Sequence, residues 1–233
     1  MTPLATHNPI IIALDVESAA DARSLIHRIG PRVNFYKVGL ELYAAAGMDF
    51  VRGLLSDGHR IFLDLKFYDI PETVSRAVAR VAATGVDFLT IHAVPSVMRA
   101  AAAARRGSNL RLLAVTVLTS FGSEDLDDLG FEGTIAELVE RRAHKAMELG
   151  IDGIVASPLE AAAVRSIIGP DAVLVTPGVR SAGADKGDQK RVATPAQAIR
   201  DGASYLVIGR QVTRAADPAA EVDRILFELA EVG

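Results

Sequence analysis

Short apolar runs alternate with longer amphipathic segments along almost the whole chain. A short run of Val, Ile, Leu and Phe predicts a buried strand, whereas apolar residues at three- and four-residue spacing predict a helix. Strands are expected at residues 10–14, 35–38, 61–66, 88–93, 111–118, 153–157, 172–176 and 205–209. Helices are expected at residues 18–29, 40–56, 71–84, 96–106, 134–149, 159–168 and 219–232.

Strict alternation of strand and helix predicts a parallel sheet. About eight such units in 233 residues most simply close into a (β/α)8 TIM barrel, whose active site lies at the carboxyl ends of the strands. Residues 1–233 are expected to form a single barrel domain. An open doubly wound sheet is the alternative, but no G-x-G-x-x-G motif follows the first strand, which weakens a dinucleotide-binding interpretation.

The composition narrows the class of protein. With 50% hydrophobic and 23% charged residues, the chain is typical of a globular protein with a large core. A net charge of -4 gives no general attraction to nucleic acid or to an acidic membrane surface. The absence of cysteine excludes disulfides and thiolate chemistry, and no apolar stretch reaches the length of a bilayer. A cytoplasmic protein without membrane or nucleic-acid partners is expected.

Residues 61–73 (I-F-L-D-L-K-F-Y-D-I-P-E-T) are the most informative stretch. Asp64 and Lys66 are two residues apart, so on a strand they point to the same face. Asp69 follows where the strand gives way to a loop, and Pro71 suits the first turn of a helix. An isolated pair of opposite charges is usually structural. Burying three charges at the end of an apolar strand is costly, however, and therefore indicates a functional site.

Other predicted strands also end in polar residues, and charges of alternating sign fall on three successive strands. Each lysine there lies between acids, which keeps the lysines protonated and the carboxylates ionised. A fixed ammonium can donate a proton, and an aspartate can repel a substrate anion. No set of His, Asp and Glu has convincing metal spacing. The polar residues at strand ends are Asp15, Lys37, Asp64, Lys66, His92, Thr119, Ser157 and Arg210, of which His92 is interpreted as a packing residue.

The last two strands carry a second candidate feature. The loops after strands seven and eight form the usual phosphate site of these barrels. Gly209 lets the backbone approach a ligand, and Arg180 and Arg210 can form paired hydrogen bonds with a phosphate. The small, polar residues 181–189 that follow strand seven belong to this site or form an ordinary surface connection.

These motifs together resemble orotidine 5'-phosphate decarboxylases. The resemblance lies in A-L-D, Y-K-V-G, D-L-K-F-Y-D-I-P-E-T, V-T-P-G-V-R, G-D-Q-K-R and V-I-G-R, in order over nearly the whole chain. It implies conversion of orotidine 5'-monophosphate to uridine 5'-monophosphate and CO2, the last step of de novo UMP synthesis, without cofactor or metal. It also implies a homodimer with shared active sites. Tyr68 departs from the histidine that is frequent at its position in the family.

The resemblance further implies roles for individual residues. Lys66 would donate the proton to C6, within a network of Lys37, Asp64, Lys66 and Asp69. Asp69 would reach the partner subunit's site together with Ile70 and Thr73. The other substrate-binding residues would be Asp15 and Lys37 at the ribose hydroxyls, Thr119 at the pyrimidine, Arg180, Gln189, Gly209 and Arg210 at the phosphate end, and Pro177.

Two other functions compete with this interpretation. 3-Keto-gulonate 6-phosphate decarboxylases and hexulose phosphate synthases share D-x-K-x-x-D, but they need magnesium bound partly by an acid at the second strand. Lys37 occupies that position here. A catalytically silent phosphate-binding protein is the rival from a different class, and the full set of charges argues against it.

Overall fold

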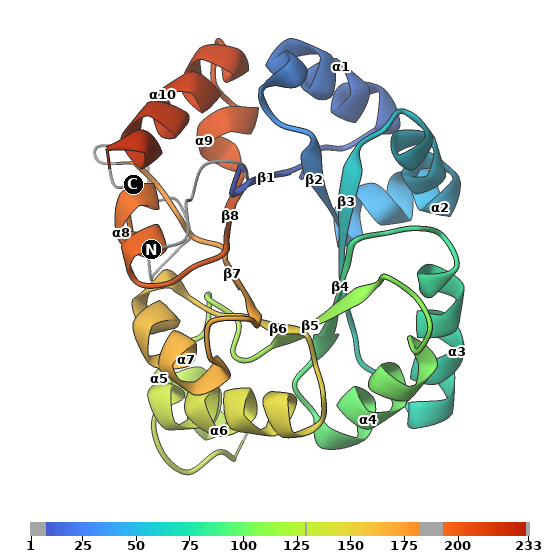
Figure 1. The fold of residues 1–233 in the computed structure, drawn as a ribbon, viewed down its shortest axis with the longest axis vertical. Coiled ribbons are helices and arrows are strands. Elements are labelled where there is room, and N and C mark those ends of the chain that lie inside the picture. Colours follow the sequence, from blue (N-terminus) through green and yellow to red (C-terminus); the bar gives the residue numbers. More distant parts are fainter. Residues whose placement is uncertain (1–7, 129, 182–192, 232–233) are drawn as a thin grey trace.

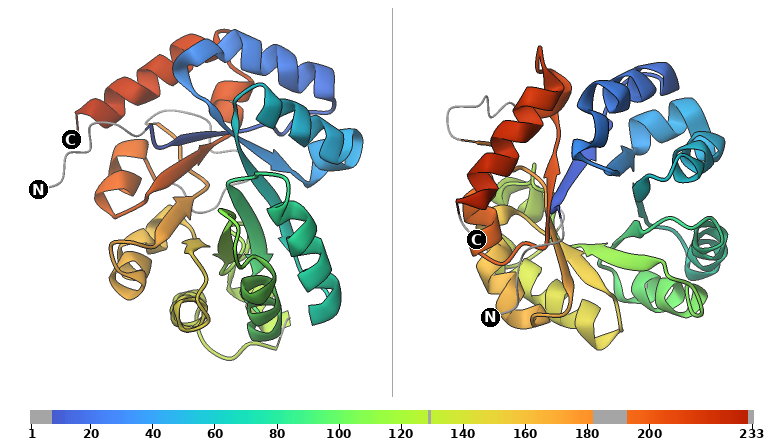
Figure 2. Two further views of the ribbon diagram at one scale, coloured as in Figure 1. Left: turned by 45° about the vertical axis from the view of Figure 1, so that its right-hand side comes forward. Right: turned by 45° about the horizontal axis from the view of Figure 1, so that its top comes forward.

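Eight parallel strands close into a barrel in chain order, with β8 pairing back to β1. The structure is a computed structural model that describes residues 8–128, 130–181 and 193–231. Figure 1 looks into the ring of strands with the helices outside it, and the tilted views of Figure 2 show helices along the outer side of the strands. The predicted (β/α)8 TIM barrel is confirmed.

Most strands are buried along their length, as expected for a parallel sheet covered by helices on its outer face. The strands are β1 (Ile10–Ala13), β2 (Phe35–Gly39), β3 (Arg60–Phe67), β4 (Phe88–His92), β5 (Arg111–Val115), β6 (Gly153–Val155), β7 (Val173–Thr176) and β8 (Tyr205–Ile208). The helices are α1 (Ala19–Ile29), η1 (Gly30–Arg32), α2 (Leu40–Ser56), α3 (Pro71–Ala82), α4 (Pro95–Ala104), α5 (Ser123–Asp128), α6 (Ile135–Glu148), η2 (Pro158–Glu160), α7 (Ala161–Ile168), α8 (Pro195–Arg200), α9 (Arg210–Thr213) and α10 (Pro218–Ala230). Within the described ranges, no helix has the length and apolar character needed to span a membrane.

The fifth strand is shorter than its sequence pattern predicts. The apolar run continues to Leu118, but β5 ends at Val115. Val115 pairs with the last residue of β4 on one side and the last residue of β6 on the other. Beyond Val115 the regular register ends, although the Thr116 N–H still donates to the Val155 carbonyl of β6. The short helices α5 and α8 were not predicted, because six residues carry too few apolar repeats to show a helical period.

Aromatic rings fill the amino-terminal half of the barrel. Phe88 meets Phe35 at 5.1 Å, Tyr205 at 5.3 Å and Phe62 at 5.9 Å between ring centroids, all edge to face. The Arg60 guanidinium lies 4.1 Å from the centroid of the Phe35 ring. Such aromatic pairs each contribute about 0.5–1.5 kcal/mol beyond their buried area. Aromatic rings therefore fill the amino-terminal end of the barrel, and the polar residues that end the strands lie at the carboxyl end.

Candidate active site

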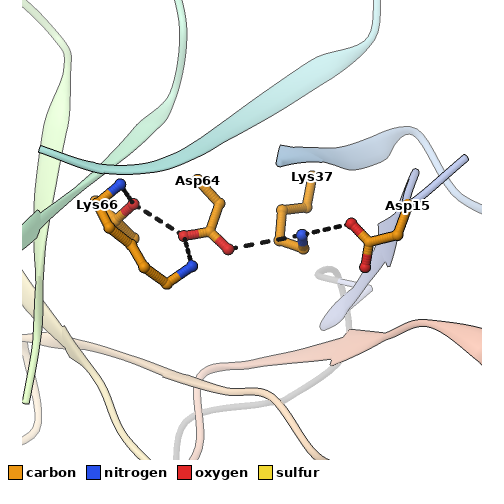
Figure 3. A network of polar contacts seen from close by, with 5 residues as sticks. Asp15, Lys37, Asp64 and Lys66 are labelled. Carbon is orange, nitrogen blue, oxygen red and sulfur yellow. Dashed lines mark hydrogen bonds and ion pairs between the residues drawn. The ribbon is translucent and has the colours of Figure 1, made fainter. Parts of the chain in front are cut away.

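Four charged side chains form a continuous row across the carboxyl ends of β1, β2 and β3 (Figure 3). The Lys37 ammonium lies 2.9 Å from Oδ1 of Asp15 and 3.6 Å from Oδ2 of Asp64. The Lys66 ammonium lies 2.9 Å from Oδ1 of Asp64. These four residues are called the charged row below. The structure therefore brings together the alternating charges that the sequence pattern predicts at neighbouring strand ends.

The middle of the charged row is buried yet charged. Lys37 is 8% exposed. Burial alone would lower the pKa of Lys37, but the negative charges of Asp64 and Asp15 and their hydrogen bonds outweigh it and raise the pKa. For Asp64, burial acts to raise the pKa, and the charges of Lys37 and Lys66 with their hydrogen bonds outweigh it and lower the pKa. Both groups are therefore ionised at neutral pH and held in place by their neighbours.

The backbone between Asp64 and Lys66 is not a regular strand. The register between β3 and β4 shifts between Leu63 and Phe67, and Lys66 has a φ of 49°, the one positive φ of a non-glycine residue in the described part of the chain. The Thr90 hydroxyl stabilises this irregularity: it accepts from the Lys66 N–H and donates to Asp64 Oδ1, both at 2.9 Å. Sequence reasoning missed Thr90, whose only signal was a polar residue inside an apolar strand.

Gly39 makes room for the charged row. A Cβ added at this position would lie 3.0 Å from the Lys37 Nζ and 3.2 Å from the Asp15 Oδ1. These contacts are tighter than most real Cβ contacts, so the Lys37–Asp15 ion pair would have to shift by a few tenths of an ångström. The glycine of the Y-K-V-G motif is therefore required because a side chain here would crowd Lys37 and Asp15.

The charged row lines one side of a cavity of about 500 Å³ at the carboxyl end of the barrel. Arg180 and Arg210 also line it, beyond the ends of β7 and β8, together with Thr119, Pro177 and Gly209. Some lining residues lie on helices and loops, where the sequence pattern carries no sign that a polar residue faces the cavity. The full lining is Ala13, Asp15, Lys37, Glu41, Phe62, Asp64, Lys66, Val115, Val117, Leu118, Thr119, Ser120, Val155, Ala156, Pro177, Gly178, Arg180, Val207, Gly209, Arg210 and Arg214. Among its polar residues, Glu41, Ser120 and Arg214 were not predicted.

The backbone at Arg180 is held by the far side of its loop. Val179 forms a parallel bridge with Ala193, and the Arg180 N–H donates to the Ala193 carbonyl at 3.0 Å. Arg180 is buried to 8% exposure and donates from Nη1 to the Val179 carbonyl at 2.8 Å. A pre-positioned guanidinium at this rim suits a phosphate or carboxylate. Gln189, which is expected at the same end, lies outside the described residues.

Three predicted site residues lie away from the cavity of their own chain. Asp69, Ile70 and Thr73 are exposed on and after the connection between β3 and α3. The Asp69 carboxylate accepts from the Ile70 N–H at 2.6 Å rather than from the charged row. Tyr68 and Ile70 are each 67% exposed, and two large exposed side chains so close together form an apolar patch on this connection.

His92 and Ser157 have structural contacts. His92 packs edge to face against Tyr68 at 5.6 Å, and burial, followed by the positive charges of Arg142 and Lys66, lowers the pKa of His92. The Ser157 hydroxyl caps η2 by accepting from the Leu159 N–H. Among the residues that the structure describes, no group of three or more His, Cys, Asp or Glu is placed to hold a metal ion.

A closed parallel barrel with a charged row and three arginines around one cavity at its carboxyl end has the architecture of a (β/α)8 enzyme. Comparison with known proteins makes the assignment specific. The model of the orotidine 5'-phosphate decarboxylase / HUMPS family matches residues 8–225, and the chain belongs to this family.

Individual relatives are similar over nearly their whole length. An orotidine 5'-phosphate decarboxylase of Methylobacterium sp. (strain 4-46) is 51% identical over 232 residues, covering 98% of both chains. One from Rhodopseudomonas palustris (strain BisB5) is 49% identical over 227 residues, covering 97% of both. The crystal structure of orotidine 5'-phosphate decarboxylase from Lactobacillus acidophilus superposes with a TM-score of 0.84 at 36% identity, covering 96% of this chain and 99% of that one.

Proposed function

We propose that the chain decarboxylates orotidine 5'-monophosphate to uridine 5'-monophosphate and CO2, the last step of de novo UMP synthesis. The observation that carries this proposal is the charged row, largely buried at Lys37 and Asp64, on the wall of a cavity that arginines also line. Its relatives at about half identity carry the name of this activity.

Lys66 is assigned the central chemical role. When the bond from C6 to the carboxylate breaks, the electron pair stays on C6, where no adjacent group can take up the charge. An ammonium already fixed at that carbon stabilises the developing charge without reorganisation. Lys66 then transfers a proton from Nζ to C6 and is reprotonated from solvent. Its contact with Asp64 at 2.9 Å holds the ammonium in position for this step.

The rest of the charged row is assigned to the substrate's ribose and carboxylate. Asp64 lies beside the leaving carboxylate in this scheme. Lys37 lies between Asp15 and Asp64, and its positive charge offsets the repulsion between the two carboxylates. The Asp15 side chain is 53% exposed and lines the cavity, so that it and Lys37 can bind ribose hydroxyls. Thr119, which also lines the cavity, is assigned to the pyrimidine.

The phosphate is assigned to the side of the cavity formed after β7 and β8. Arg180 and Arg210 supply the charge, and Gly209 admits the phosphate close to the backbone. Pro177 is assigned to the same substrate, and Gln189 is kept from the family resemblance. Binding energy gained at the phosphate can be used to hold C6 against Lys66, which raises the rate at the reacting carbon.

We propose further that the chain is a single barrel domain that pairs with a second copy and completes the copy's active site with Asp69, Ile70 and Thr73. Exposure of these residues and of Tyr68 in the isolated chain supports this assignment. The cytoplasmic location and the absence of nucleic-acid partners stay predictions from composition.

Complementation tests the shared site. Lys66→Ala and Asp69→Ala variants are each expected to be inactive alone. In mixed dimers one of the two sites regains both residues, so random reassociation should restore about a quarter of the unsubstituted activity. No recovery from mixtures that demonstrably exchange subunits would contradict a shared site.

A direct assay tests the activity itself. The purified protein should lower the ultraviolet absorbance of orotidine 5'-monophosphate, and EDTA should leave the rate unchanged. Lys66→Ala should abolish turnover while keeping the fold and UMP binding, and Lys145→Ala, which changes a partly exposed lysine on α6, should act normally. Near-normal turnover by Lys66→Ala would remove Lys66 from its role. Loss of turnover in EDTA would favour a magnesium-dependent sugar-phosphate enzyme.

A further inference from the structure

A second cavity of about 140 Å³ lies directly behind one wall of the active site. Val115, Val117 and Leu118 line both cavities, so the end of β5 and the residues that follow it are the partition between them. The far side of the second cavity is formed by α6 and by the connection that contains α5, which lie together on the outside of the barrel in Figure 1. It is called the rear cavity below, and its lining is His92, Val115, Thr116, Val117, Leu118, Phe121, Leu126, Phe131, Leu138 and Arg142.

Arg142 connects the helix wall of the rear cavity to the partition. It extends from α6, and its Nη1 donates a hydrogen bond to the Thr116 carbonyl. The guanidinium also lies 5.4 Å from the centroid of the Phe131 ring, a cation–π distance. The start of α6 is itself held by a reciprocal capping pair, Thr134 and Glu137. Arg142 therefore projects from a well-anchored helix.

The Thr116 carbonyl is where regular sheet pairing stops. The Thr116 N–H and hydroxyl both donate to the Val155 carbonyl, at 3.3 Å and 3.2 Å. Its own carbonyl lies past the last paired residue, Val115, and is taken by Arg142. Thr116 is 1% exposed, so solvent cannot replace this donor freely. The peptide group after Thr116 thus takes its orientation from Arg142, and residues 117–120, which form the active-site wall, follow from that peptide.

We propose that Arg142 is a positioning residue for the base-binding wall of the active site. By holding the Thr116 carbonyl it places Val117, Leu118 and Thr119 against the pyrimidine, without touching the substrate itself. This inference rests on the proposed function, because it concerns the wall assigned to the pyrimidine. It predicts that Arg142 controls affinity for the base and leaves affinity for the phosphate end unchanged.

The test compares two ligands that share the phosphate end. UMP contains the base, and ribose 5-phosphate lacks it. Titration calorimetry on the full chain should show that Arg142→Met weakens UMP binding by about tenfold, the effect of one lost hydrogen bond to a partly buried group. Ribose 5-phosphate affinity should stay within about twofold of the unsubstituted protein. Arg142→Lys, which keeps a cationic donor, should recover part of the UMP affinity.

Arg141→Met is the matched control, since Arg141 is the exposed neighbour on the same helix, and it should bind both ligands normally. Equal loss of affinity for both ligands in Arg142→Met, or no loss for either, overturns the positioning role. If Arg142→Met gives no cooperative thermal transition, Arg142→Lys decides by the same ratio of affinities. A failure of the proposed function looks different: the unsubstituted protein would then bind UMP no better than ribose 5-phosphate and leave orotidine 5'-monophosphate intact.

Discussion

Replacing Lys66 by Gly is expected to give a more stable protein than replacing it by Ala, the reverse of the usual order in a strand. Lys66 has a φ of 49°. An L-residue in this left-handed region costs about 1–2 kcal/mol, and glycine does not carry that cost. Glycine loses about 0.5–1 kcal/mol through the entropy of the unfolded chain. The net expectation is about 1 kcal/mol in favour of Lys66→Gly, or about 3 °C in Tm for a chain of this size.

The comparison is informative because both variants lack the ammonium and lose the same contact with Asp64. Thermal and urea unfolding of the two proteins should be compared with the same pair at Arg111, at the start of β5, where the φ is not positive. Arg111→Gly should be less stable than Arg111→Ala by about 0.5–1 kcal/mol. If glycine is the less stable choice at both positions, the strain attributed to Lys66 is refuted. Neither Lys66 variant should turn over substrate.

Three further results are expected. Gly39→Ala should lower kcat/KM by about tenfold or more with the fold retained, because the new Cβ would crowd the Lys37 ammonium at 3.0 Å; steady-state kinetics checks this. The Asp64 pKa is lowered from 3.8. The ionised Asp64 carboxylate therefore stabilises the fold above pH 3.8, and this stabilisation is lost as the pH falls through the lower pKa of the folded protein. The Lys37 pKa is raised from 10.5, so its contribution is present below 10.5 and lost as pH rises through the higher value. Between pH 3.8 and pH 10.5, Asp64 and Lys37 should therefore leave the free energy of unfolding, measured in urea, independent of pH. A change with pH in this range that is assigned to either residue would contradict their charged state. Arg165→Met should lose about 2–4 kcal/mol, since four hydrogen bonds to three carbonyls and a serine hydroxyl disappear, whereas the exposed Arg52→Met should stay within about 0.5 kcal/mol in the same unfolding assay.

The sequence predicted the barrel because eight apolar runs and the helices between them carry strong periodic signals. It also predicted that Asp64 and Lys66 share a face and that Lys37 joins them, since strand ends of a parallel barrel converge. The irregular backbone at Lys66 was not predictable from two-residue alternation. This irregularity depends on the Thr90 hydroxyl of the next strand, and the residues around Lys66 carry no pattern that predicts this contact.

Other parts of the site depend on relations that a linear pattern does not carry. Where β5 ends is set by the lengths of β4 and β6 rather than by its own apolar run. Glu41, in α2, and Arg214, directly after α9, line the cavity from beyond the strand ends. Asp69 has its predicted role in a second copy of the chain, which the fold of one copy does not test.

The rings packed inside the barrel have a consequence for how a gaseous product would escape. Phe62 belongs to both the ring cluster and the cavity lining, so it forms the boundary between the two. Beneath it, Phe88, Phe35 and Tyr205 obstruct any passage along the axis. CO2 released beside Lys66 would have to travel outward, through the same opening by which the nucleotide arrived and past the ribose still bound there. The order in which CO2 and the nucleotide leave is therefore set by the opening of the cavity that both would use.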